Sequence, residues 1–304
     1  LTQFIDWHIE DLQESADHWS GLCVDSARIP SSFLAALGNS EITDHSRDNL
    51  SATIDRALAF LNFDPICRES WEVQRTKVWG QDILIGDAFS RSLVCEVLAT
   101  RGCIPSKQAG EILKQYKQNG WRYYRDFSAL PPDIDDIAQS IRLVDWVEWK
   151  KKRRHSYLLT PIQWLAHNRN DDGSFPVWMT EGIKDKPETG WIPLGGTHCL
   201  GCEANLLEAL AGLQKIDQQW LQEGGASLLS RWRAQGTNGI YYYKPAYGIF
   251  LIARCFSRLS KDSRLSSRLR NELAHELHRL GDRCNTISAG EHCLSIAAKV
   301  MVLA

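Results

Sequence analysis

The chain has 304 residues, of which 43% are hydrophobic and 24% are charged, and its formal net charge is −2. This length allows one large hydrophobic core, and the near-neutral charge excludes a general nucleic-acid-binding surface. No apolar run approaches the roughly 20 residues of a transmembrane helix, and residues 1–6 lack the basic region of a signal peptide. The nine cysteines form no regular framework, which favours reduced thiols in a cytoplasmic protein with at most peripheral membrane contact.

Helical spacing of apolar residues recurs along the whole chain. Residues 1–38 predict a helix followed by a loop and residues 50–61 predict a helix, with a polar linker over residues 39–49 between them. We expect one domain, in which residues 1–65 form N-terminal helices that pack on a repeat core of residues 66–304. Helices are predicted in that core over residues 87–98, 105–118, 133–146, 158–167, 198–210, 218–235, 245–253 and 266–280, and from residue 290 onward.

Loops that combine glycine with aromatic residues separate several of these helices. They recur at Gly120, Gly173 and Gly239, which are 53 and 66 residues apart, a spacing typical of helical-hairpin repeats with uneven insertions. A single hairpin cannot bury its own apolar face, so several hairpins have to close on one another. The expected fold is therefore all-α, an (α/α)6-type toroid with apolar helices inside and more polar helices outside.

Three carboxylates fall within four residues at the start of the helix that follows a pair of prolines. Asp133 is a good N-cap, because its side chain can accept the free backbone N–H groups of the first turn, but Asp135 and Asp136 are not needed for capping. Like charges in one turn repel one another unless they face water, share a proton or meet a cation. Two interpretations follow: a solvated acidic helix start, or a cluster of acids that titrates as a unit.

The pattern Asp133-Ile-Asp135-Asp136 has the D-x-D-D form of class II terpenoid cyclases, and residues 120–136 resemble the matching block of single-domain squalene-hopene-cyclase-like proteins. Residues 168–175 also resemble the Q-x-x-D-G-S-W repeat of that superfamily. The resemblance covers roughly residues 70–304. It implies proton-initiated cyclisation of a hydrophobic isoprenoid or prenylated substrate, with Asp135 as the proton donor and Asp133 and Asp136 orienting it and adjusting its acidity.

The resemblance also implies that inner-helix N-termini and aromatic rings line a dry cavity, where the rings stabilise carbocations. We expect no resident metal and no cofactor; Mg²⁺ would be needed only if the substrate carried a diphosphate. The substrate-binding residues expected on these grounds are Asp87, Trp121, Tyr123, Tyr124, Phe175, Trp178, His198, Cys199, Tyr247 and His292.

Two groups of residues permit other chemistry. Five side chains, His198, Cys199, Cys202, His292 and Cys293, are of the types that bind zinc, but buried thiols and hydrogen-bonded imidazoles explain them without a metal. The basic run at residues 150–154 suits a diphosphate or an anionic membrane surface, but a solvated loop between helices is the favoured interpretation.

Two other functional classes stay open at this point. One is a carbohydrate-active toroid, in which Asp87 and Asp135 act as acid and base on a glycosidic bond. The other is a non-catalytic ligand-binding toroid, in which the three aspartates only cap a helix. A metal-dependent cyclase of class I is disfavoured, because Gln139 stands where the last aspartate of D-D-x-x-D would be.

Overall fold

The computed structural model describes residues 73–78, 81–86, 88–100, 106–124, 127–128, 130–147, 151–180, 198–236 and 245–286. The chain divides into two compact units, residues 1–69 and 70–304, and every described residue belongs to the second unit. The predicted packing of residues 1–65 on the repeat core lies outside the described residues and stays a prediction.

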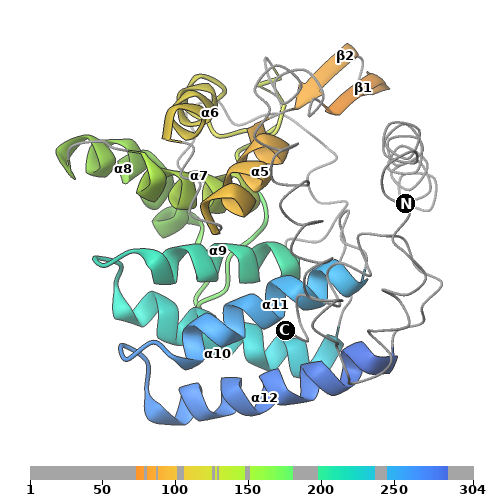
Figure 1. Cartoon of the computed structure of the whole chain (residues 1–304), viewed down its shortest axis with the longest axis vertical. Coiled ribbons are helices and arrows are strands. Elements are labelled where there is room, and N and C mark those ends of the chain that lie inside the picture. Colours follow the sequence, from red (N-terminus) through yellow and green to blue (C-terminus); the bar gives the residue numbers. More distant parts are fainter. Residues whose placement is uncertain are drawn as a thin grey trace, which may run out of the picture. The chain divides into compact units, whose positions relative to one another are not determined.

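Helices make up most of the described part of the chain, as Figure 1 shows, which confirms the predicted all-α class. The observed range of α10 coincides with the predicted one, and the other helices overlap their predicted ranges. The bounds are α5 Ala88–Thr100, α6 Ser106–Gln118, α7 Ile134–Trp146, α8 Lys151–Asn168, α9 Leu200–Gly212, α10 Gln218–Gln235, α11 Pro245–Ser260 and α12 Ser267–Thr286.

Helix α8 begins about two turns before the predicted start, so the basic residues 151–154 lie in a helix. The predicted loop over this run is wrong. Lys and Arg are strong helix formers, and the first proline or glycine after residue 150 is Pro161, which lies well inside α8.

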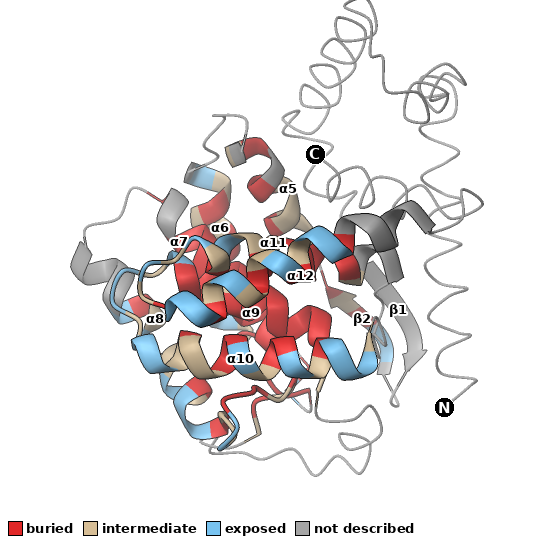
Figure 2. Ribbon diagram, turned by 90° about the horizontal axis from the view of Figure 1, so that it is seen from below, coloured by how far each residue is buried: buried red, intermediate tan, exposed pale blue. Residues whose placement is uncertain are grey.

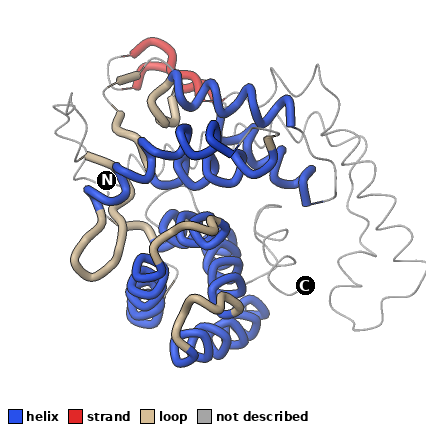
Figure 3. The backbone as a smooth tube through the Cα atoms, turned by 90° about the vertical axis from the view of Figure 1, so that its left-hand side faces the viewer, coloured by secondary structure: helices blue, strands red, loops and turns tan. Residues whose placement is uncertain are grey.

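A β-hairpin precedes α5, and the predicted pattern of helices contains no counterpart for it. Strands β1 (Val73–Val78) and β2 (Gln81–Gly86) pair antiparallel, with Val73 opposite Gly86 and Val78 opposite Gln81. In the sequence two residues, Trp79 and Gly80, stand between the two strands. The hairpin lies at one edge of the helices in Figure 3.

The odd-numbered helices α5, α7, α9 and α11 pack side by side in chain order. Helix α6 packs on α5 and α7, α10 packs on α9, and α12 packs on α10 and α11. Figure 2 shows the consequence for burial: α9 is buried along nearly its whole length, whereas α10 and α12 each present an exposed face. Helix α9 is therefore at the centre of the described core.

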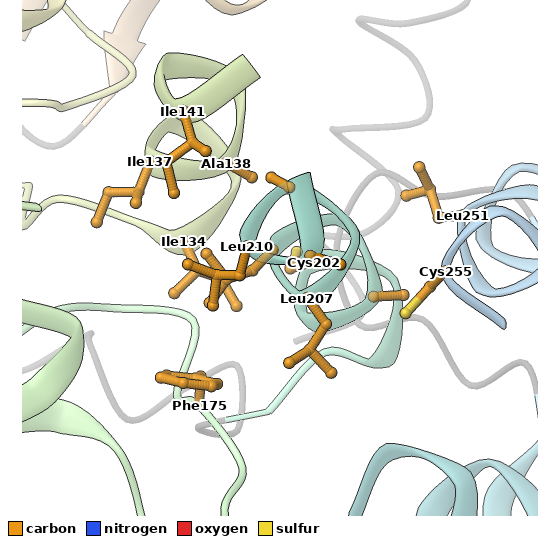
Figure 4. Packing of buried hydrophobic residues seen from close by; sticks show 14 of the residues in the cluster. Ile134, Ile137, Ala138, Ile141, Phe175, Cys202, Leu207, Leu210, Leu251 and Cys255 are labelled. Carbon is orange, nitrogen blue, oxygen red and sulfur yellow. The ribbon is translucent and has the colours of Figure 1, made fainter. Parts of the chain in front are cut away.

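Apolar side chains from three consecutive odd-numbered helices fill this core. Figure 4 shows Ile134 of α7 beside Leu210 of α9, with Leu251 and Cys255 of α11 on the other side of α9. All four are at most 2% exposed. Cys95, Cys199, Cys202 and Cys255 are buried and form no disulfide bond among the described residues, so these cysteines behave as small hydrophobic residues.

The glycine-containing loop after α8 is built by its own polar side chains and fixes the beginning of α7. Asp172 accepts hydrogen bonds from the backbone N–H of Ser174 (3.0 Å) and from its hydroxyl group (2.5 Å). Further along, the carbonyl of Val177 accepts from the N–H of Ile134 at 3.0 Å, and the N–H of Met179 donates to the carbonyl of Pro132 at 2.8 Å. The segment after this loop therefore pairs with the residues that carry the three aspartates.

Within the described part of the chain, no helix has both the length and the apolarity needed to cross a membrane.

Candidate active site

Asp133 is the N-cap of α7, as predicted. Its backbone is extended, with φ −118° and ψ 161°, and its carboxylate accepts a hydrogen bond from the backbone N–H of Asp136 at 2.8 Å. The pairing of Ile134 with Val177 satisfies a second free N–H group of the first turn. These two hydrogen bonds hold the first turn of α7 in place, and with it the positions from which the side chains of Asp135 and Asp136 project.

All three carboxyl groups are removed from water. Asp133, Asp135 and Asp136 are 2%, 3% and 0% exposed. A solvated acidic helix start would leave these side chains in water, so the burial excludes that interpretation. Three carboxylates cannot all be ionised at such close range in an apolar environment, and the cluster has to retain protons.

Asp135 is the member of the cluster that contacts α9. Its carboxylate accepts a hydrogen bond from the side-chain amide of Asn205 at 2.9 Å. Burial, reinforced by the charge of Asp133, raises the pKa of Asp135 to about 8, and hydrogen bonds from Asn205 and Cys202 oppose that rise. Asp135 is therefore a carboxylic acid that keeps its proton at neutral pH.

Asp133 and Asp136 lie at the start of α7 together with Asp135, and the N–H of Asp136 donates to the carboxylate of Asp133. Burial raises the pKa of both carboxyl groups, and for Asp136 the charge of Asp133 raises it further. The hydroxyl group of Tyr116, which is itself fully buried, lies close enough to Asp136 to lower that pKa. Within the described residues, neither carboxylate oxygen of Asp136 has a hydrogen-bond partner of ordinary geometry. Asp136 is thus most stable in its protonated, uncharged form.

We expect the free energy of unfolding to decrease between about pH 5 and about pH 8. In this interval Asp135 is protonated when folded but ionised when unfolded, where its pKa is near 3.8, so the folded chain binds more protons and a rise in pH favours unfolding. The loss from Asp135 alone over this interval is about 4 kcal/mol at most. Glu203 adds to it, because burial raises its pKa to about 7. Urea denaturation across this range measures the effect, and Asp135→Asn should flatten it.

Asp133 offers a separate test, because its capping role and its charge can be removed independently. Asp133→Ala should cost about 1 kcal/mol of stability through loss of the N-cap, whereas Asp133→Asn should retain the cap. Either change removes a negative charge that raises the pKa of Asp135, so the pKa of Asp135 should fall. Denaturation of both variants, together with NMR titration of Asp135, would show whether the two effects separate. Equal stability losses in both variants would contradict the assigned cap.

Two other predicted residues lie beside the cluster. Cys199 is the residue before α9, is 1% exposed, and its charge would raise the pKa of Asp135. Trp178 forms an isolated β-bridge with Asp133, so its backbone lies next to the cap.

The predicted aromatic residues do not form one group around the aspartates. The ring of Trp121 lies edge-on to Tyr157 and Trp164 of α8, at centroid distances of 5.8 and 5.4 Å, and Phe175 packs on Trp220 at 5.9 Å. Among the described contacts, none joins Trp121 or Phe175 to the three carboxyl groups. Their role as carbocation-stabilising rings therefore gains no support, and their visible role is packing between helices.

The rings of Tyr123 and Tyr124 lie 4.8 Å apart in an edge-on pair, and Tyr123 also meets Phe89 of α5 at 6.2 Å. The two tyrosines belong to the loop before α7, and the contact with Phe89 packs this loop on α5. Whether these two rings face the substrate stays a prediction.

His198 belongs to a second polar cluster, on a different face of α9. Glu203, which is fully buried, pairs with Arg231 of α10 and accepts from the backbone N–H of Phe175 at 3.3 Å. Burial and the charge of Arg231 both lower the pKa of His198. Side chains two residues apart on a helix point about 200° apart, so Glu203 and Asn205 face different neighbours. The predicted convergence of His198 with the aspartates is not observed.

Three predicted residues cannot be placed. Asp87 and His292 lie outside the described residues, and for Tyr247 the structure describes only the backbone, within α11. Sequence reasoning also missed two residues of the site, Tyr116 and Asn205. For Asn205 a signal existed, since it is a polar residue in an apolar helix, three positions after Cys202 and hence on the same face.

In the part of the chain that the structure describes, no three His, Cys, Asp or Glu side chains are arranged to hold a metal ion. Comparison with known proteins found no match among protein-family models, curated proteins or solved structures.

Proposed function

We propose that the protein is a class II-type terpenoid cyclase-like enzyme, in which Asp135 protonates a carbon–carbon double bond or an epoxide of an isoprenoid substrate and so starts its cyclisation. The observation that carries this proposal is the buried carboxyl group of Asp135, which retains its proton at neutral pH. The D-x-D-D pattern gives the same residue this role by resemblance.

The surroundings of Asp135 suit proton transfer to carbon. A general acid has to be protonated before the reaction and has to leave a stabilised base behind. The amide of Asn205 already donates to the carboxylate oxygen of Asp135, and the Cys202 thiol also favours the ionised form. In a site without water, the carbocation formed on the substrate is a further counter-charge for the new carboxylate. No metal or cofactor takes part in this step.

The packing of the helices is compatible with the proposed toroid. Four successive odd-numbered helices lie side by side, and even-numbered helices cover them, which is the alternation of inner and outer helices that an (α/α)6 barrel requires.

The two alternative functions receive less support. A glycosidase holds its two carboxyl groups across a wet cleft, whereas Asp135 is 3% exposed and its proposed partner Asp87 is not described. A purely capping role needs only Asp133, and it does not explain why Asp135 is buried against Asn205. Proton-initiated chemistry accounts both for the low exposure of Asp135 and for its hydrogen bond from Asn205.

The test is to incubate the purified full-length protein in D₂O with polyprenols, squalene, prenylated aromatic compounds and prenyl diphosphates. Protonation of an alkene by Asp135 requires one solvent-derived deuterium in each cyclised product, whereas ionisation of a diphosphate does not. Turnover should fall above about pH 8, where Asp135 loses its proton. A cyclised product without deuterium would exclude the proposed mechanism.

A further inference from the structure

A network of four charged residues joins the four odd-numbered helices. Glu208 of α9 accepts from Arg142 of α7 at 2.8 Å and from Arg254 of α11 at 3.3 Å, and Arg254 also pairs with Glu96 of α5. Each of these residues is the ninth or tenth of its helix, so the four lie at the same level. The two guanidinium and two carboxylate groups carry no net charge together.

This ion network is connected to the acid through α7 and α9. On α7, Asp135, Gln139 and Arg142 follow one another at helical spacing and share a face. On α9, the side-chain amide of Asn205 donates to Asp135 at 2.9 Å, while its backbone carbonyl accepts from Arg142, also at 2.9 Å. Arg142 lies seven positions after Asp135 on α7, which corresponds to a rise of about 10 Å along the helix axis.

Several polar atoms of the ion network, and of α7 and α9 beside it, are buried but have no hydrogen-bond partner among the described residues. Three are acceptors: Oε2 of Glu96, Oε1 of Gln139 and Oδ1 of Asn205; the donor Nη1 of Arg142 is also unpaired. These residues are 8%, 1%, 2% and 9% exposed, so water outside the protein does not satisfy them. A buried polar group without a partner is costly and calls for an explanation, so these four atoms are candidates for contact with a bound molecule.

The kinds of atoms left unpaired select among substrates. A diphosphate can only accept hydrogen bonds and brings negative charge, so it would satisfy Arg142 but would meet the unpaired acceptor Glu96. A hydroxyl group both accepts and donates, and it is uncharged. It can therefore accept from Arg142 and donate to Glu96. Arg258, which also faces Glu208, is exposed on α11 and does not alter this pattern.

We propose that Arg142 and Glu96 bind the hydroxyl group of an isoprenoid alcohol, so that the enzyme takes an uncharged substrate rather than a prenyl diphosphate. The inference rests on the proposed function: the hydroxyl end of the substrate contacts the ion network, while the alkene at the other end is protonated by Asp135. The separation of about 10 Å along α7 then sets the distance between the hydroxyl group and the alkene that is protonated.

Equilibrium binding tests this assignment without relying on turnover. Full-length Asp135→Asn protein is titrated with farnesol or geranylgeraniol, with the methyl ether of each, which can accept but cannot donate, and with each diphosphate. The alcohol should bind about tenfold more tightly than the ether or the diphosphate, because only the alcohol satisfies Glu96. Adding Glu96→Met should bring the alcohol-to-ether affinity ratio close to one.

Glu272→Met is the matched control. Glu272 of α12 pairs with Arg233 of α10 at 2.9 Å and with Arg268 of α12 at 3.0 Å, and its substitution should leave the ratio unchanged. Equal binding of alcohol and ether by the Asp135→Asn protein, or tightest binding of the diphosphate, would overturn the assignment. So would an unchanged ratio after Glu96→Met. These outcomes are distinct from failure of the proposed function, which would appear as wild-type protein that selects alcohols but forms no deuterated product.

Discussion

Asp135→Asn should fold normally and lose turnover. The amide keeps the size of the carboxyl group and an oxygen that can accept from Asn205, so packing and the 2.9 Å hydrogen bond are retained. It has no acidic proton to deliver. General acid catalysis is typically worth about 10² to 10⁴ in rate, and protonation of an unactivated alkene depends on it at least as strongly. Product formation and deuterium incorporation, measured beside wild type, give the result.

Asp171→Asn is the control, because Asp171 is an exposed aspartate in the loop after α8 and is not a member of the cluster. This variant should turn over like wild type. If Asp135→Asn kept wild-type turnover, Asp135 would not be the acid. A folded, inactive Asp135→Asn protein beside an active Asp171→Asn protein would support the assignment.

Gly173→Ala should destabilise the protein by about 3 kcal/mol, because it combines backbone strain with a clash. Gly173 has φ +84°, a conformation that residues with a side chain rarely adopt. An added Cβ would lie 2.6 Å from the Cβ and 2.7 Å from the backbone carbonyl carbon of Glu223 in α10. The helix backbone cannot move away easily, so the loop would have to shift. Urea denaturation would measure the loss.

The matched substitution is Gly212→Ala in α9. Gly212 lies at the end of that helix, and an added Cβ there would meet nothing within 4 Å. Alanine is the better helix former, so this change should be neutral or stabilising by up to about 1 kcal/mol. Equal stability of the two variants would contradict the explanation that the close packing of this loop on α10 requires a glycine at position 173.

The positions of the helices could be predicted from the sequence because each helix has its own signal. The range of α10 agrees at both ends, since Asp217 is an N-cap that accepts from the N–H of Gln219 and Gly236 ends the helix with φ +65°. The N-cap role of Asp133 was predictable for the same reason. Such signals act over a few residues, and they failed where two structures compete locally, as at the start of α8 and in the β-hairpin.

The candidate site was only half predictable. The pattern of three aspartates named the acid, but a solvated cap and a buried acid have the same sequence, and the burial of Asp135 depends on α9, some 70 residues away. Likewise, Trp121, Phe175 and His198 have chemistry that suits a cavity, and the tertiary packing gives them other neighbours.

What the sequence determined by itself is therefore the approximate range of each described helix, the N-caps of α7 and α10, and the residue types available for chemistry. The tertiary structure decided which of those residues meet. Asn205 faces Asp135, whereas Glu203, only two positions earlier, faces Arg231. The physical reason is that burial and neighbouring charges arise where helices pack against each other, not between residues adjacent in the chain. These two factors set the pKa of a buried acid and decide which polar atoms are left unpaired.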